Sequence, residues 1–583
     1  MEDPIIKKPT PGTIEKPNIK KAAPGTIDKP KIPTIQKPTP SPLPGKPLIF
    51  SNTYDAEEIA KLPHTTSELT YDRSSGDKLA HNAMKWFDGA PKPTPGNVVV
   101  PYIYGRSAFE DIADALSCAT SPEHRIYLIG WWVLPDTAMK NPVNGNPPAN
   151  SQLKDYLKNT KAQVRGLFWD TFLKGQSGDN KEITNYINSL PNGAALEDNR
   201  LVAGKLPDRG PNIHHQKLLV VSGDAGLVAF LGGMDINYSR LGDSPLHDVH
   251  VRLNGPSAAA ALSNFRDRWL DHPATAALDQ NRFQLSRDAV KQDFDRIISN
   301  RKSDVKPSCT VPGGKVNVDR RMLVSIGRTF PNLNKFNSGD RYQFPNPDQS
   351  AWQLIKNGIE NAKEYIYVED QYLVSRRVRD LLVKKLREEQ FKFLLILMNN
   401  SIDFEAGSPP EFPFLIGTRN EIRTDLSAVD PKRQKWRMFS LKNPPDSARK
   451  GWCGSYVHSK TWIFDDEYVV VGSANCDDRG YSYDTEIVAG ITEEPISRVL
   501  GGRFARDLRI SLWRKHLGIP HVYLQKFSTG LAYWQNPPPS AMIFDNSDLE
   551  DSPLFNGAKE LTRDNKNANY VWTHLSDPDA DKL

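Results

Sequence analysis

The chain has 583 residues and a formal net charge of +5, with 38% hydrophobic and 25% charged side chains. This length exceeds what one hydrophobic core serves, so it predicts two sizeable domains or two halves of one. The charge tolerates an anionic partner but is far from that of a dedicated nucleic-acid-binding protein, and no run of 18 apolar residues predicts a membrane-spanning helix.

The first 49 residues form a segment rich in proline and lysine. Residues 1–47 contain twelve prolines and almost no aromatic side chains, so they cannot bury enough apolar surface to fold. Within this segment, PGTIEKPNI (11–19) recurs as PGTIDKPKI (24–32). No apolar signal sequence is present, which predicts synthesis in the cytoplasm without Sec export. We expect a disordered tail, acting either as a stiff tether or as a docking segment.

Two copies of one module follow, at residues 50–300 and 346–520, with a polar linker at 301–345. In each copy a stretch with helical spacing precedes an apolar strand, namely 107–119 before 125–133 and 351–363 before 364–374. Equivalent residues recur at offsets of 238 to 243 positions: Tyr127 and Tyr367, His215 and His458, Gly232 and Gly472, Asp248 and Glu486, and Phe265 and Phe504. The repeat predicts two tandem α/β/α sandwiches, and residues 521–583 are interpreted as a peripheral arm.

The second module contains YVHSKTWIFDDEYVVVGSAN at 456–475. His458 and Lys460 are two apart, so on a strand they point the same way, about 7 Å apart along the backbone. Asp465 follows at the end of the apolar run, where a hairpin turn is expected. A second apolar run then leads to a turn of small side chains and donors that can approach an anion: Gly472, Ser473 and Asn475.

The first module contains HHQKLLVVSGDAGLVAFLGGMD at 214–235, in which His215 and Lys217 match the pair above. Here the histidine and the glycine turn are 17 rather than 14 positions apart, which places three extra residues in the hairpin turn SGDAG. Ser222 stands where the second module has an aspartate. The turn that follows the second apolar run contains Gly232, Gly233 and Asp235.

Two histidines and two lysines gathered around one phosphate can form a phosphodiesterase site. The lysines can neutralise the non-bridging oxygens, one histidine can attack phosphorus, and the other can protonate the leaving oxygen and then activate water or an alcohol. Each imidazole needs a carboxylate to fix its tautomer. Asp248 and Glu486, at equivalent positions of the two modules, are the candidates.

The duplicated H-x-K motif resembles the signature of the phospholipase D superfamily. Supporting features are GWW (130–132), GGMDINYSR (232–240), FRDRW (265–269), EDQYL (369–373) and GSAN (472–475). The resemblance implies an active site between the modules, no required metal or cofactor, and His215 as the nucleophile with His458 as the general acid and base. It also implies that Asp465 is structural, and that Asp224 compensates for Ser222 in the longer turn.

Several residues near these motifs allow more than one interpretation. Trp131 and Trp132 either line a substrate pocket or pack in the core, and we favour the core. Asp370 and Gln371 either border the site or only end a strand. Three histidines without equivalents in the second module are interpreted as structural: His214, His247 and His250. The four widely spaced cysteines form no zinc pattern or disulfide framework, which favours a reducing compartment.

Four activities compete for this site: glycerophospholipid hydrolysis or transphosphatidylation, nucleic-acid cleavage, cardiolipin or phosphatidylserine synthesis, and lipid binding without catalysis. The complete motifs and the lack of a strong basic stripe favour the first, with membrane phospholipid as substrate and no nucleic acid as partner. The overall arrangement resembles that of bacterial phospholipase D effectors of type VI secretion. That resemblance implies contact-dependent delivery to a target-cell membrane, docking of residues 1–47 on the secretion spike, and an immunity protein as a further partner.

Overall fold

The computed structural model describes twelve segments of the chain, and these belong to one compact unit. They are residues 83–103, 105–140, 148–170, 178–198, 213–241, 246–299, 322–331, 348–398, 413–442, 456–482, 484–494 and 504–547. The tail predicted at 1–49 and its repeat lie outside the described residues. Among the described helices, none has the length and apolar character needed to cross a bilayer.

Seven strands of the first half form a sheet in the spatial order β1-β7-β6-β5-β2-β3-β4. Strands β2, β3 and β4 run parallel to one another, and the remaining neighbours pair antiparallel. The strands are β1 (Thr94–Ile103), β2 (Arg125–Gly130), β3 (Gln163–Trp169), β4 (Gly193–Asp198), β5 (Leu218–Gly223), β6 (Gly226–Gly232) and β7 (Val249–Asn254).

The second half repeats this order as β8-β15-β14-β13-β10-β11-β12, extended by β16 and flanked by the short β9. Its strands are β8 (Met322–Phe330), β9 (Asp348–Gln349), β10 (Tyr365–Asp370), β11 (Phe393–Met398), β12 (Trp436–Leu441), β13 (Thr461–Phe464), β14 (Tyr468–Gly472), β15 (Glu486–Glu493) and β16 (Ile543–Asp545). Strands β1 and β8 pair antiparallel and join the two sheets. The repeated order confirms the predicted fold class of two tandem α/β modules.

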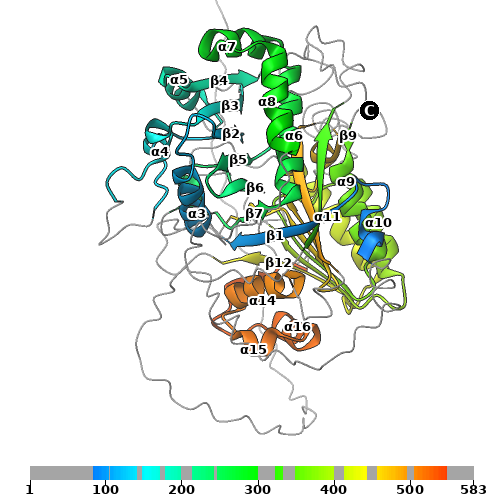
Figure 1. Ribbon diagram of the computed structural model, residues 1–583. Coiled ribbons are helices and arrows are strands. Elements are labelled where there is room, and N and C mark those ends of the chain that lie inside the picture. The colour runs from blue at the N-terminus through cyan, green and yellow to red at the C-terminus, as the bar shows by residue number, and fades with distance from the viewer. Residues whose placement is uncertain are drawn as a thin grey trace, which may run out of the picture. The chain divides into compact units, whose positions relative to one another are not determined.

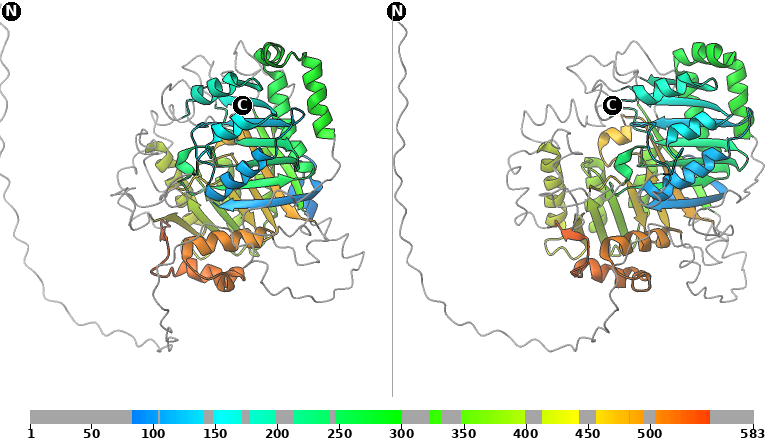
Figure 2. Two further views of the ribbon diagram at one scale, coloured as in Figure 1. Left: turned by 60° about the vertical axis from the view of Figure 1, so that its left-hand side comes forward. Right: turned by 90° about the vertical axis from the view of Figure 1, so that its left-hand side faces the viewer.

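Helices cover both faces of each sheet (Figures 1 and 2). In the first half, α3 (Gly105–Ser117), α4 (Leu153–Asn159) and α5 (Lys181–Ser189) pack on one face, and α6 (Pro256–Asp271), α7 (Pro273–Phe283) and α8 (Arg287–Ser299) lie on the other. In the second half, α9 (Ser350–Asn361), α10 (Arg376–Leu386) and α11 (Pro413–Val429) pack opposite α14 (Phe504–Leu517), α15 (His521–Leu524) and α16 (Phe527–Gln535).

Strand β5 shows why the apolar run after Lys217 forms a fully buried strand. Successive side chains of a strand point to opposite faces of the sheet. Leu218 and Val220 therefore enter the central core shared by the two halves, whereas Leu219 and Val221 enter the outer core of the first half. Because both faces are covered by helices, the run is continuously hydrophobic rather than alternating.

The extra residues of the first hairpin lengthen its strands and not its turn, which corrects the sequence prediction. Strands β5 and β6 pair over six positions, up to Gly223 opposite Gly226, whereas β13 and β14 pair over four. The connection in the first hairpin is then only two residues, Asp224 and Ala225, against three in the second. The added residues form further backbone pairs between β5 and β6 instead of a longer turn.

Carboxylates at both hairpin ends hold the segment that leads into the first parallel strand. The Asp465 carboxylate accepts hydrogen bonds from the backbone N–H groups of Lys363, Glu364 and Tyr365, at 2.7 to 2.8 Å, just before and at the start of β10. In the first half, Asp224 accepts from the Thr120 hydroxyl at 2.7 Å, just before β2. Both acids lie at the hairpin ends away from the histidines, and their structural role remains a prediction that these contacts support.

Two predicted boundaries and one cysteine need correction. Residues 322–330, predicted as linker, form β8, which pairs with all of β15. The sequence prediction missed this strand because its short apolar run lies within a polar stretch. Residues 521–547 are not a peripheral arm, since Leu524 and Trp534 are fully buried and β16 pairs with β12. Cys118 is disulfide-bonded, which its wide spacing from the other cysteines did not predict.

Candidate active site

Two short bridges between the halves bring the H-x-K motifs together. The backbone N–H of His215 donates to the carbonyl of Thr485 at 3.0 Å, and the N–H of His458 donates to the carbonyl of His247 at 2.8 Å. Both contacts belong to isolated parallel β-bridges between the two halves, one that pairs His214 with Thr485 and one that pairs His247 with Val457. The bridges place His215 next to Thr485, which precedes Glu486, and His458 next to His247, which precedes Asp248.

The His215 ring is oriented by the second half. Its Nδ1 lies 2.9 Å from Oε1 of Glu486 and 3.1 Å from the carbonyl oxygen of Ser473. Both neighbours are acceptors, so Nδ1 carries a proton and the lone pair of the neutral ring is on Nε2. The Ser473 hydroxyl in turn donates to the other oxygen of Glu486, which fixes the carboxylate.

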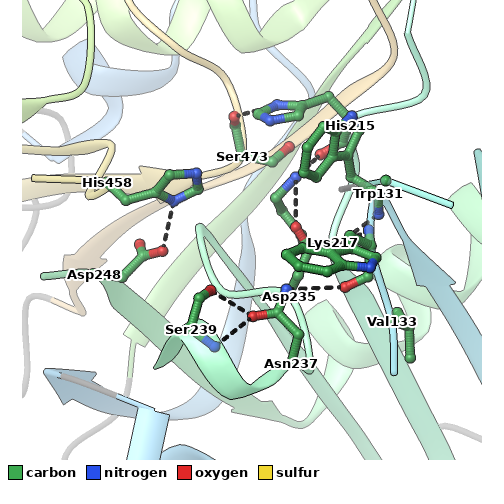
Figure 3. A network of polar contacts seen from close by, with 12 residues as sticks. Trp131, Val133, His215, Lys217, Asp235, Asn237, Ser239, Asp248, His458 and Ser473 are labelled. Atoms are coloured by element: carbon green, nitrogen blue, oxygen red, sulfur yellow. Dashed lines mark hydrogen bonds and ion pairs between the residues drawn. The ribbon is translucent and has the colours of Figure 1, made fainter. Parts of the chain in front are cut away.

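The His458 ring is oriented by the first half. Its Nδ1 lies 2.8 Å from Oδ2 of Asp248, as Figure 3 shows. Arg240 adds a second contact, with Nη2 3.2 Å from Nδ1 of His458 and Nε 3.3 Å from Oδ2 of Asp248. Both acids are the ones that the sequence predicts, but only the structure shows that each orients the histidine of the other module.

The two lysines are held in equivalent ways and are both buried. Lys217 donates to the carbonyl of His215 at 2.8 Å and lies 3.2 Å from Asp235, and Lys460 donates to the carbonyl of His458 at 2.6 Å. Gln371 accepts a further hydrogen bond from Lys460 at 2.9 Å. Two lysines beside two imidazoles form a cluster of cationic and titratable groups suited to a phosphodiester.

Burial dominates the electrostatics of the site. It lowers the pKa of both catalytic-type histidines well below 6.5, and the charges of the lysines lower it further. Burial also lowers the pKa of Lys460 to about 7 and raises the pKa of Asp248 to about 6. The pKa of Glu486 is raised well above its usual value for the same reason. An incoming phosphate anion would offset these penalties, because it restores charge balance.

The glycine turns permit close approach of the acid-bearing strands. A Cβ on Gly233 would lie 2.1 Å from Oδ1 of Asp248, and one on Gly472 would lie 2.5 Å from the carbonyl oxygen of Ile487. Gly232 has a φ of +156° and adjoins the backbone of His250. Asn475 is buried at the end of the second turn, and Asp235, at the equivalent place in the first, accepts from the N–H groups of Trp131 and Trp132.

Trp131 and Gln371, at equivalent strand ends of the two halves, both border the site. The Trp131 ring meets the His215 ring edge-on, with centroids 6.3 Å apart, stacks on Trp169, and lies 5.8 Å from the Lys217 ammonium. Our preference for a core role of Trp131 was therefore wrong, whereas Trp132 is buried as expected. Asp370 instead anchors the backbone N–H of Cys476.

Arg240 is the site residue that sequence reasoning missed, although it ends the GGMDINYSR stretch. A lone arginine after a glycine turn carries no local signal, because its role depends on Asp248 and His458. Of the histidines interpreted as structural, His247 and His214 lie in buried networks, and His250 is buried beside Gly232. His247 and His516 both contact the Glu369 carboxylate, at 2.8 and 2.9 Å, and His214 lies 3.2 Å from Asp198.

Comparisons with known proteins agree with this architecture. Residues 355–508 match the family model described as "Cardiolipin synthase, PLD-like domain". Phospholipase D zeta 2 and phospholipase D alpha 3 of Arabidopsis thaliana are 22% and 24% identical, with alignments that cover 73% of this chain. The alignments span 54% and 64% of those relatives, so the chain matches between half and two thirds of their length.

One solved structure extends over most of the described fold. The crystal structure of phosphatidylserine synthase from Haemophilus influenzae Rd KW20 aligns with 78% of this chain and 98% of that chain. The TM-score is 0.45 and the sequence identity is 13%.

Proposed function

We propose that this chain, for which the family model and the plant relatives support the phospholipase D superfamily, is a phospholipase D that hydrolyses or transphosphatidylates glycerophospholipids. The observation that carries the proposal is the convergence of two His–Lys pairs, in which each histidine is oriented by a carboxylate of the opposite half. The products are phosphatidic acid, or a phosphatidyl alcohol, and the free headgroup.

In the first step, His215 is the nucleophile. Its Nε2 lone pair attacks phosphorus, and the bond between phosphorus and the headgroup oxygen breaks. His458, protonated at Nε2, gives that proton to the departing oxygen. Lys217 and Lys460 neutralise the non-bridging oxygens. The result is a phosphatidyl group bound covalently to His215, a neutral His458 and a free headgroup alcohol.

In the second step, His458 acts as a base. It takes a proton from water or from an acceptor alcohol, whose oxygen attacks phosphorus. The phosphorus–nitrogen bond breaks, and His215 recovers its Nε2 lone pair. Glu486 stabilises the N–H on Nδ1 of His215 in both steps, because its carboxylate faces that nitrogen at 2.9 Å.

The assignment of His215 as nucleophile is supported by the contacts of its ring. Both groups that face its Nδ1 are acceptors, and together they hold the tautomer whose Nε2 is nucleophilic. The ring of His458 faces Arg240 and Lys460 as well as Asp248, and these cations favour release of a proton to the leaving group.

A membrane-borne substrate is supported by Tyr238. Its side chain is 62% exposed, which is unusual for a large aromatic residue among those described, and it lies two residues before Arg240. Trp132 supports it from behind, with ring centroids 5.6 Å apart. Tyrosine rings favour the boundary between water and lipid, so this rim suits a bilayer surface.

One experiment separates the candidate activities. The protein is incubated with vesicles of phosphatidylethanolamine, phosphatidylglycerol and phosphatidylcholine, with nucleic acid in the same tube, and products are identified by mass spectrometry. We expect phosphatidic acid and free headgroup, with no loss of nucleic acid. His215→Ala and His458→Ala should abolish release, and release that survives in both variants would refute the mechanism.

A transferase is the second candidate, because the matching family model is named after cardiolipin synthase. Adding glycerol and serine to the vesicle reaction distinguishes it from a hydrolase. Phosphatidyl products formed in preference to phosphatidic acid would identify a phosphatidyltransferase that uses the same two steps.

We further propose that the chain is a secreted effector, delivered by contact, with residues 1–47 docking on the secretion spike. The proline- and lysine-rich repeat at 11–19 and 24–32 supports this docking role, since prolyl segments lose little entropy on binding. Deletion of residues 1–47 should stop delivery but leave lipase activity intact. Unchanged delivery would contradict the docking role, and an immunity protein is expected to co-purify with the catalytic halves.

A further inference from the structure

The two half-sites differ in what faces each histidine. Nδ1 of His215 is faced by two acceptors, Glu486 and the carbonyl of Ser473. Nδ1 of His458 is faced by one acceptor, Asp248, and by two cations, Arg240 and Lys460, each 3.2 Å away. The duplicated fold therefore contains an asymmetric pair of imidazoles. Arg240 contacts His458 directly, whereas Arg479, near the corresponding place in the second half, pairs with Asp484 at 2.9 Å and adds to the charges that lower the pKa of His215.

Arg240 is built into place for this contact. It is buried, with 3% of its side chain exposed, and its Nη1 donates to the Ser239 hydroxyl at 2.5 Å. That serine is held by Asn237, whose side chain also donates to the carbonyl of Trp132 at 3.2 Å. The remaining nitrogens, Nε and Nη2, face Asp248 and His458.

Asp248 and His458 share a proton that can lie on either partner. Burial without a nearby cation favours the neutral arrangement, with the proton on the carboxyl and a neutral imidazole. Burial indeed raises the pKa of Asp248 to about 6, and the Arg240 charge is the first influence that lowers it. A general acid needs the opposite arrangement, with an ionised carboxylate and a protonated ring.

We propose that Arg240 is a positioning residue that keeps Asp248 ionised against His458 and sets how readily the protonated ring gives up its proton to the leaving group. The inference rests on the proposed phospholipase D mechanism, in which His458 is the general acid. Arg240 touches both members of the pair and needs no contact with the substrate. Its positive charge also makes the imidazolium a stronger acid towards the leaving group.

Other charges around the pair are part of the same balance. Lys460 and Lys217 lower the pKa of the His458 ring together with Arg240 and His215. His247 lies beside Asp248 in the chain and contacts Glu369 behind it. All of these groups remain in an Arg240 variant, so a change in the pH profile of that variant reports on Arg240 alone.

The test compares Arg240→Gln with Arg240→Lys in the full-length protein. The substrates are a natural phospholipid and its p-nitrophenyl analogue, whose leaving group departs without protonation. For Arg240→Gln we expect the kcat/KM of the natural lipid to fall about 10²-fold, the size of a lost general acid. The kcat/KM of the p-nitrophenyl ester should fall by less than about tenfold, because its leaving group needs no proton.

The pH profile gives the readout that a structural role would not move. Without the cation, the Asp248–His458 pair binds its shared proton more tightly, so the basic limb of kcat/KM should move up by about one pH unit in Arg240→Gln. Arg240→Lys, which keeps the charge, should leave the limb close to that of the wild type. Thermal unfolding of both variants shows whether each is folded.

Two outcomes would overturn the inference. One is an equal loss of activity on both substrates with an unmoved basic limb in folded Arg240→Gln. The other is an identical pH profile for the lysine and glutamine variants. Failure of the phospholipase D proposal itself is distinguishable, because it would show as an inactive wild type on both substrates.

Discussion

Oε1 of Glu486 lies 2.9 Å from Nδ1 of His215, although 271 residues separate them in the chain. In the reciprocal pair, Oδ2 of Asp248 lies 2.8 Å from Nδ1 of His458, which is 210 residues away in the chain. Each half thus contributes the imidazole of one pair and the carboxylate of the other. The candidate active site therefore lies at the interface, because each of the two histidines is oriented by a carboxylate of the opposite half.

The two acids should have separable effects. Asp248→Asn and Glu486→Gln are each expected to lower turnover of a natural phospholipid by about 10²- to 10⁴-fold, since an amide can present an N–H to Nδ1 and select the wrong tautomer. With a p-nitrophenyl leaving group, Asp248→Asn should regain a burst of p-nitrophenol, whereas Glu486→Gln should not. A burst seen only in Glu486→Gln would reverse the assignment, with His458 as the nucleophile and His215 as the general acid.

Gly233→Ala should damage catalysis more than folding. The added Cβ would lie 2.1 Å from Oδ1 of Asp248, so the carboxylate must move away from His458. We expect a loss of kcat of at least about 10²-fold, as for a displaced catalytic partner. Gly472→Ala is the matched control, because its Cβ meets the Ile487 carbonyl and the Val488 side chain instead. The control should lose about 1–3 kcal/mol of unfolding free energy.

For the glycine pair, activity assays and urea unfolding are measured on the same preparations. The interpretation fails if Gly233→Ala is as active as the wild type, or if its loss of activity merely follows its loss of stability as in the control.

Asp465→Ala should lower stability and spare the chemistry. The carboxylate accepts three backbone hydrogen bonds before and at the start of β10, and its removal leaves those donors without their partner. We expect a loss of about 2–3 kcal/mol in the free energy of unfolding, measured by urea titration. Asp224→Ala, at the equivalent hairpin end but with 61% of its side chain exposed, should lose less than about 1 kcal/mol. Complete loss of activity in folded Asp465→Ala would contradict a structural role.

Affinity for an oxyanion should fall as pH rises through about 7. Burial lowers the pKa of Lys460 to about 7, so its ammonium form, which attracts the anion, is lost above that pH. Inhibition by tungstate, whose own charge is constant in this range, should weaken by up to about tenfold per pH unit. Lys460→Arg, which stays protonated, should flatten the dependence between pH 6 and about 8.5. A wild-type inhibition constant that is flat over the same range would disprove the titration of Lys460.

Tyr238→Ala should weaken action on bilayers but not on soluble substrate. The exposed Tyr238 ring packs against Trp132 and lies two residues before Arg240, so we expect it to act through the lipid surface rather than on the reacting groups. We expect a several-fold higher apparent KM on vesicles, corresponding to about 1 kcal/mol of lost interfacial binding, and an unchanged rate on a short-chain monomeric substrate. Equal losses on both substrates would assign Tyr238 to the site itself.

The sequence alone predicted the two-module plan and named most of the residues that the structure brings together around the two histidines. An offset of 238 to 243 positions between matching residues reveals duplication, and a strand places His215 and Lys217 on one face by its period of two. These are local or repetitive properties, and they survive without any knowledge of long-range contacts. Strand β8 could not be predicted in the same way, because its nine residues lie within a polar stretch that hides their apolar character.

The tertiary structure decided how the pieces combine. Only the bridges between the halves, His215 with Thr485 and His247 with Tyr456, show that each acid serves the opposite histidine. The placement of Trp131 beside His215 and of Arg240 beside His458 likewise depends on contacts across long chain separations. Such contacts leave no periodic trace in one sequence, because they are formed by packing and charge at an interface, whereas strand alternation and duplication are written along the chain itself.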